Sequence, residues 1–189
     1  MIINEKALVR QMKEAYKNQG YTVAVNNDIM VICSGYWLVQ VESDNVPAEV
    51  LSLFAMHMRK IPENGDAYKV VKGDDGSYVQ KKLIADALGP VETMEKLLAE
   101  ADEDGGAAPM KKTNLRYDGC SVWQSQETLG IFLIDPRYEA LIAADDSVCM
   151  LGTGIYAEGN ISKIWIMRVD KKYEQAKIQH LAGIRWVAI

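Results

Sequence analysis

The side chains that commonly carry catalysis are few in this sequence. His57 and His180 are the only two histidines. The three cysteines, Cys33, Cys120 and Cys149, are far apart along the chain. A cysteine and a histidine act as nucleophile and base when the fold brings them together. One hypothesis for the function is therefore a small hydrolase or transferase that uses Cys33, Cys120 or His57.

The local sequence around these residues favours structural roles instead. Cys33 ends the apolar run "IMVIC" and Cys149 lies within "VCML", which are usual settings for a small buried side chain. His57 follows Phe54 by three residues in a predicted helix, at the boundary of the apolar face. We interpret all three cysteines as core residues. The sequence favours a protein that is not an enzyme and leaves the question open.

The spacings typical of metal and phosphate sites do not occur. No H-x-x-x-H, C-x-x-C or H-E-x-x-H motif is present. Carboxylates cluster at residues 74–75, 102–104 and 145–146, but aspartate is common in turns, and the middle cluster lacks the glycine and final glutamate of an EF-hand loop. "GTGIYAEG" has spaced glycines without a Walker lysine. We expect neither a metal ion nor a cofactor.

Composition and charge narrow the class of protein. Lys and Arg number 21 against 26 Asp and Glu, so the net charge is −5 and gives no general attraction to nucleic acid. No apolar stretch reaches the roughly 18 residues of a membrane-spanning helix, and the N-terminal segment mixes Glu and Lys. An odd number of distant cysteines is typical of reduced thiols. We therefore expect a cytoplasmic protein without membrane association.

The aromatic residues favour rings with a polar group, because four Trp and nine Tyr accompany only two Phe. All four tryptophans, Trp186 among them, fall in predicted strands, where sheet packing is the ordinary explanation. A binding face is the alternative. The candidate binding residues are Trp37, Lys163, Trp165, Met167 and Arg168.

The hydrophobic pattern predicts an α+β chain. Helices are expected at 5–19, from 47 to about 58, at 91–101 and from Pro136. Strands are expected at 21–25, 29–33, 36–42, 67–73, 77–85, 113–117, 120–126, 129–134, 147–154, 163–170 and 184–189. They form mainly antiparallel sheet with about four helices packed on one face. The acidic, glycine-containing segment 102–109 predicts a linker between modules 1–101 and 110–189, which alternatively pack as one domain.

One segment resembles a known family. Residues 130–170, with the helix "DPRYEALIAADD", the strand "SVCMLGTG" and the closing "IWIMRV", resemble the last repeat of a sliding-clamp domain. That family's closing strand ends in an isoleucine-methionine-proline-methionine-arginine run. Met167 and Arg168 match its last two positions, and Ile166 stands where the family has proline. The resemblance implies a clamp-like fold and a ring, assembled from several copies, that holds DNA through basic residues such as Lys163 and Arg168.

Two classes of function follow, besides the hydrolase or transferase. The main hypothesis is a non-enzymatic binding or assembly protein that uses a sheet edge or an aromatic face to hold a second copy of itself or a protein partner. The alternative is a DNA-associated, clamp-like accessory protein. The whole chain also resembles small proteins of gut Firmicutes and their prophages, which implies a bacterial or prophage origin and no activity.

Overall fold

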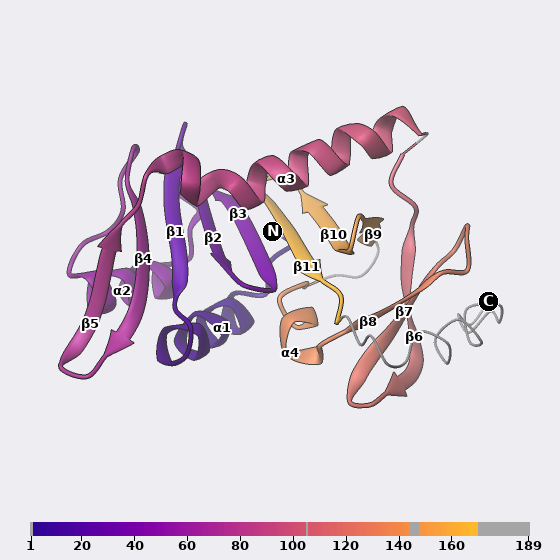
Figure 1. The fold of residues 1–189 in the computed structure, drawn as a ribbon, viewed down its shortest axis with the longest axis horizontal. Helices are drawn as coiled ribbons and strands as arrows, with labels where there is room; N and C mark the ends of the chain where they lie inside the picture. The colour runs from indigo at the N-terminus through magenta and orange to yellow at the C-terminus, as the bar shows by residue number, and fades with distance from the viewer. Residues whose placement is uncertain (1, 105, 144–147, 170–189) are drawn as a thin grey trace.

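The computed structural model describes residues 2–104, 106–143 and 148–169. The described chain is α+β, with an antiparallel sheet of eight strands, a second sheet of three strands and four α-helices (Figure 1). The predicted fold class is confirmed in these respects. The expected strand 184–189 lies outside the described residues, as do His180, Trp186 and the carboxylates at 145–146.

The first half of the chain builds most of the large sheet. Asn4 caps the first helix through its side chain, which accepts a hydrogen bond from the Ala7 N–H. Gly20 then takes a φ of +82°, and a Cβ there would lie 2.7 Å from the Val70 carbonyl oxygen, so the turn into the first strand requires glycine. The elements are α1 (Glu5–Lys17), β1 (Tyr21–Asn26), β2 (Ile29–Ser34), β3 (Trp37–Glu42), the 3-10 helix η1 (Ser43–Asn45), α2 (Ala48–Met58), β4 (Ala67–Gly73), β5 (Gly76–Lys81) and α3 (Ile84–Glu103).

The second half adds the small sheet and completes the large one. Its fourth helix begins as the sequence predicts, with the Asp135 side chain as cap and Pro136 at the first position. Residues 155–159, between the predicted strands 147–154 and 163–170, also form part of a strand, which the sequence pattern does not predict. The elements are β6 (Met110–Tyr117), β7 (Cys120–Ser125), β8 (Ile131–Ile134), α4 (Pro136–Glu139), β9 (Val148–Leu151), β10 (Gly154–Gly159) and β11 (Ser162–Met167).

Helix α3 is longer than predicted. It runs for 20 residues and contains Pro90, which lies just ahead of the predicted start at Val91. The turn before the proline is held by packing, because Ala87 is buried against Ala24 and Ala67 of the large sheet. Tertiary packing thus offsets the loss of one backbone N–H donor. The helix also includes 102–103, the first two residues of the predicted linker.

Helices cover both faces of the large sheet, so the prediction of one covered face is wrong. The order of strands is β5-β4-β1-β2-β3-β11-β10-β9. Side chains from α1 and α2 pack on the face that includes Ile32 and Val39, and α3 packs on the face that includes Val31 and Leu38. Figure 1 shows α3 running across the strands of this second face. Neighbouring residues of β2 and β3 are buried on opposite faces, as the continuous apolar run "IMVIC" indicates.

The two halves of the chain share the large sheet. Strand β11 pairs antiparallel with β3, in a register that sets Lys163 opposite Gln40 and Trp165 opposite Leu38. Residues on both sides of segment 102–109 therefore contribute to one continuous sheet. The division into two modules stays a prediction. No helix among the described residues has the length and apolar character needed to cross a membrane.

Candidate functional site

The five candidate binding residues do not converge on one site. Lys163, Trp165 and Met167 alternate along β11 on the face that α3 covers, whereas Trp37 belongs to the core on the α1 face. Arg168 follows the strand, and its guanidinium carbon lies 5.1 Å from the centre of the Phe132 ring. Their role in binding stays a prediction.

Trp165 packs beneath α3. Its side chain is 7% exposed and lies in a cluster with Met94 and Leu151. The indole N–H donates to the Leu151 carbonyl oxygen at 3.3 Å. A Cβ on Gly154 would lie 2.8 Å from the indole nitrogen, so glycine at this position leaves the room that the ring occupies. These contacts give Trp165 a structural role, and Trp37 is buried in the same way on the other face.

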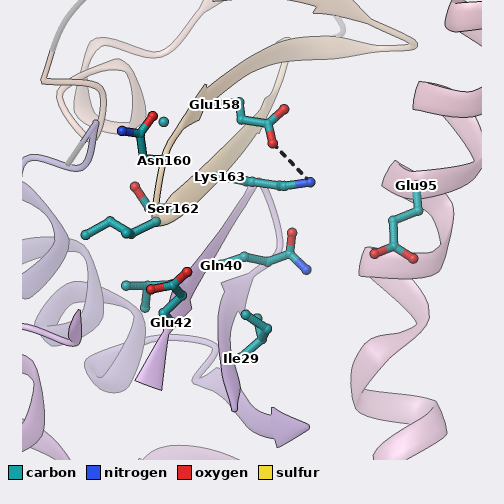
Figure 2. Close-up of a pocket in the computed structure, with 11 residues that line it drawn as sticks. Ile29, Gln40, Glu42, Glu95, Glu158, Asn160, Ser162 and Lys163 are labelled. Carbon is teal, nitrogen blue, oxygen red and sulfur yellow. Dashed lines mark ion pairs between the residues drawn. The ribbon is translucent and has the colours of Figure 1, made fainter. Parts of the chain in front are cut away.

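Lys163 lies beside a cavity of about 250 Å³ at the β10–β11 turn. Figure 2 shows its amine facing Glu158, with Glu95 approaching from α3. The Lys163 Nζ is 3.2 Å from Glu158 Oε1, and the Tyr156 hydroxyl donates to Glu158 Oε2 at 2.7 Å. Burial would raise the pKa of Glu158, but these two hydrogen bonds outweigh it and the pKa is lowered. With Glu42 also in the lining, the cavity carries more negative than positive charge and is no basic patch.

A second cavity of about 250 Å³ lies between α1, the β2–β3 turn and α4. Its lining is polar, but several of the polar groups already have partners. Arg137 binds Asp135 through Nε and Nη2, the latter at 2.6 Å from Oδ2. Gln11 donates from Nε2 to the Arg137 carbonyl oxygen at 2.9 Å. Among the described residues, no group of three or more His, Cys, Asp or Glu side chains is arranged to hold a metal ion.

The cysteines have raised pKa values. Burial raises the pKa of Cys33 to about 11. Burial also raises the pKa of Cys120 and of Cys149, with smaller contributions from the nearby carboxylates of Asp135 and Glu127. Cys120 is buried as expected, whereas Cys33 and Cys149 are only partly buried. A nucleophilic cysteine needs a lowered pKa, so these surroundings do not support the hydrolase hypothesis.

Thiol labelling of the native protein at pH 7 should therefore be uniformly slow at Cys33, Cys120 and Cys149. The rate should rise with pH, because the thiolate forms only as the pH approaches the raised pKa values. Mass spectrometry after a timed reaction with a maleimide measures each site, and the denatured protein supplies the reference rate. One cysteine that reacts in the native protein as fast as in the denatured one would contradict this expectation.

His57 is buried, whereas the sequence predicted a position at the boundary of the apolar face of its helix. It is 6% exposed, and its ring stacks on Tyr16 with centroids 3.8 Å apart. Its Nδ1 lies 3.1 Å from the Tyr21 hydroxyl. Burial, with a contribution from Lys13, lowers the pKa of His57. The Tyr16 hydroxyl also bonds the Ser77 Oγ at 2.7 Å, so this cluster connects α1 and α2 to strand β5.

Strand β5 forms one edge of the large sheet. It pairs only with β4 among the described strands, in a regular register from Tyr68 opposite Lys81 to Gly73 opposite Gly76. All six of its residues are exposed. Tyr78 is 58% exposed, and Leu83, just beyond the strand, is 73% exposed. The edge therefore presents regular extended backbone together with apolar side chains.

The outer side of β5 carries backbone groups that have no strand partner among the described residues. The Lys82 N–H donates to the Ala67 carbonyl oxygen at 2.8 Å, which shows that the even-numbered residues bond to β4. Because the direction of these groups alternates along a strand, the N–H and C=O of Ser77, Val79 and Lys81 point away from β4. Within the described chain, these three residues form a template for a further strand.

The other sheet edges are better protected. On the outer side of β9, the Met150 N–H donates to the Ala108 carbonyl oxygen at 2.7 Å. Strand β6, at the edge of the small sheet, has an irregular register between Lys112 and Arg116. Bulges and basic side chains are common devices against edge pairing. At β8, the other edge of the small sheet, the Val169 N–H donates to the Leu133 carbonyl oxygen at 2.8 Å. Of the edge strands that the structure describes, β5 is thus the regular one with an uncovered side.

Comparison with known proteins finds no family model that matches the sequence and no curated protein that matches it. Among solved structures, the chain is similar to a DNA polymerase III beta subunit from Thermotoga maritima, with 14% identity over 92% of this chain and a TM-score of 0.37. It is also similar to a putative DNA polymerase III beta subunit from Eubacterium rectale, with 9% identity over 93% of this chain and a TM-score of 0.35.

A third similar structure is a DNA polymerase sliding clamp from Bacillus subtilis, with 7% identity over 92% of this chain and a TM-score of 0.34. The chain spans 64% of the Thermotoga structure and 66% of each of the other two. These are structures of the family that residues 130–170 resemble in sequence.

Proposed function

We propose that the chain is a non-enzymatic assembly protein that binds a second copy of itself by strand addition at β5. The observation that carries the proposal is the regular, fully exposed β5 edge with the outward backbone groups of Ser77, Val79 and Lys81. Strand addition gains affinity from main-chain hydrogen bonds and specificity from the side chains that alternate along the edge.

The charges along this edge favour a second copy as the partner. Asp74 and Asp75 lie at the turn that precedes β5, and Lys81 and Lys82 lie at its other end. None of these four side chains forms an ion pair with another described residue. When two copies run antiparallel, the acidic end of each lies beside the basic end of the other. The edge is therefore complementary to itself, as a two-fold interface requires.

The other functions considered have less support. Lys163 is neutralised by Glu158, and Arg168 lies over an aromatic ring, so neither presents a free basic surface for DNA. The clamp-like accessory role and the bacterial or prophage origin stay predictions. The hydrolase or transferase role also stays a prediction, and the raised thiol pKa values give it no support.

Light scattering over a range of protein concentrations tests the proposed function. The mass should rise with concentration from the monomer value of 21.1 kDa towards twice that value. High salt should weaken the association without abolishing it, because backbone hydrogen bonds are screened less than exposed charges. A mass that stays at 21.1 kDa at every concentration would contradict the proposal. Retention of duplex DNA by the sample would instead favour the clamp-like alternative.

A further inference from the structure

We infer that the two β5 strands pair antiparallel about a two-fold axis at Tyr78, so that Ser77 lies opposite the partner's Val79. This inference rests on the proposed self-association and adds its register and symmetry. Both follow from the direction of the backbone groups and from the positions of four charged residues.

The backbone excludes half of the antiparallel registers. In an antiparallel pair, residues that exchange hydrogen bonds must both direct their N–H and C=O towards the partner strand. On the outer side of β5 these residues are Ser77, Val79 and Lys81, as the inward bond from Lys82 to Ala67 fixes. Each odd-numbered residue must therefore meet an odd-numbered residue of the partner. Under two-fold symmetry, the axis then passes midway between the two copies of one residue.

The charges distinguish among the registers that remain. With the axis at Tyr78, Lys81 lies beside the partner's Asp75 and Lys82 beside the partner's Asp74. With the axis at Ser77, Lys81 and Lys82 would extend beyond the partner's turn and away from its aspartates, because the chain turns back at Asp74 and Asp75 into β4. With the axis at Val79, Lys82 would lie opposite the partner's Gly76. The Tyr78 register is the one that pairs both lysines with both aspartates.

The side chains near the axis are compatible with this register. Tyr78 would lie opposite the partner's Tyr78 at a site without hydrogen bonds between the pair, where opposite side chains are closest. Pairs of aromatic residues at such sites stabilise antiparallel sheets. The side chain that is 58% exposed in the single chain would thus gain an apolar contact.

Cysteine cross-linking tests the register directly. Tyr78→Cys should form a disulfide between copies under mild oxidation, because the two Cα atoms at the axis fall within the range that a disulfide spans. Gln80→Cys is the matched control, since this exposed residue is on the same face and its two copies would be four positions out of register. We expect Tyr78→Cys to cross-link roughly 10-fold faster or more. The wild-type chain measures the background from its own three cysteines.

Charge reversal gives an independent test. The double variant K81E/K82E and the double variant D74K/D75K should each self-associate about 10-fold more weakly, because like charges then meet at both ends of the interface. An equimolar mixture should recover the association, since each variant then presents opposite charges to the other. Circular dichroism confirms that the variants, which alter exposed or half-buried side chains, remain folded.

The outcomes separate the register from the proposed function. A wild-type chain that is monomeric at every concentration contradicts the self-association, and with it the register. A dimer that cross-links faster through Gln80→Cys, or a mixture of charge variants that does not recover, contradicts the register and leaves the self-association in place. Fast cross-linking of Tyr78→Cys together with recovery in the mixture supports both.

Discussion

Replacing Val79 by proline is expected to leave the chain folded and to weaken its self-association roughly 100-fold. The Val79 N–H points away from β4, so proline removes no hydrogen bond within the chain, and edge strands tolerate proline at such positions. In the dimer, the substitution removes two hydrogen bonds and leaves two carbonyl groups facing a proline ring. We estimate that these losses make the free energy of self-association less favourable by about 3 kcal/mol, which corresponds to a roughly 100-fold weaker Kd.

Val79→Ala is the matched control for this variant. It removes most of the same side chain but retains the backbone N–H, so its Kd should stay close to that of the wild type. Sedimentation velocity over a concentration series measures both constants. If the proline and alanine variants associate equally well while remaining folded, the outer backbone of β5 is not the site of contact.

The second large effect is expected at Trp165. Replacing it by alanine should lower the free energy of unfolding by about 3–5 kcal/mol, the range for truncating a large buried aromatic side chain. The ring fills the space between α3 and the sheet above Gly154, and its N–H bond to the Leu151 carbonyl is lost as well. Urea denaturation followed by circular dichroism measures the change.

Trp165→Phe is the graded control, because it keeps most of the apolar volume and loses the hydrogen bond, so its destabilisation should be clearly smaller. The Kd of self-association should change little in Trp165→Phe, since β11 is separated from β5 by four other strands of the sheet. An alanine variant as stable as the wild type would contradict the structural role and would favour the predicted binding role of Trp165.

Local signals in the sequence predicted much of the fold. The cap at Asn4, the turn before β5 and the Asp135–Pro136 helix start are each specified by adjacent residues, and each lies where expected. The second covered face was missed because it depends on what packs against Val31 and Leu38 from elsewhere in the chain. The full length of α3 was missed because tertiary packing overrides the usual effect of a proline.

The candidate site was less predictable. Trp37 and Trp165 are candidate binding residues because of their residue type. Whether their side chains are buried depends on the layers that pack on each side of the sheet. Whether a strand is at an edge depends on the strand order, and β11 joins β3 across more than a hundred residues. One signal was available: "GSYVQK" contains few apolar residues although it follows a clear hairpin turn, which is typical of a strand that packs little on both faces.

The closed outer side of β9 limits how far the assembly can grow. Each copy offers its large sheet only one uncovered edge within the described chain, and pairing through β5 uses that edge in both copies. The joined sheet then ends at β9 on either side, where residues 108–109 already pair with the outer backbone groups of β9. Assembly by this route therefore stops at the dimer and does not extend into fibres, even at high protein concentration.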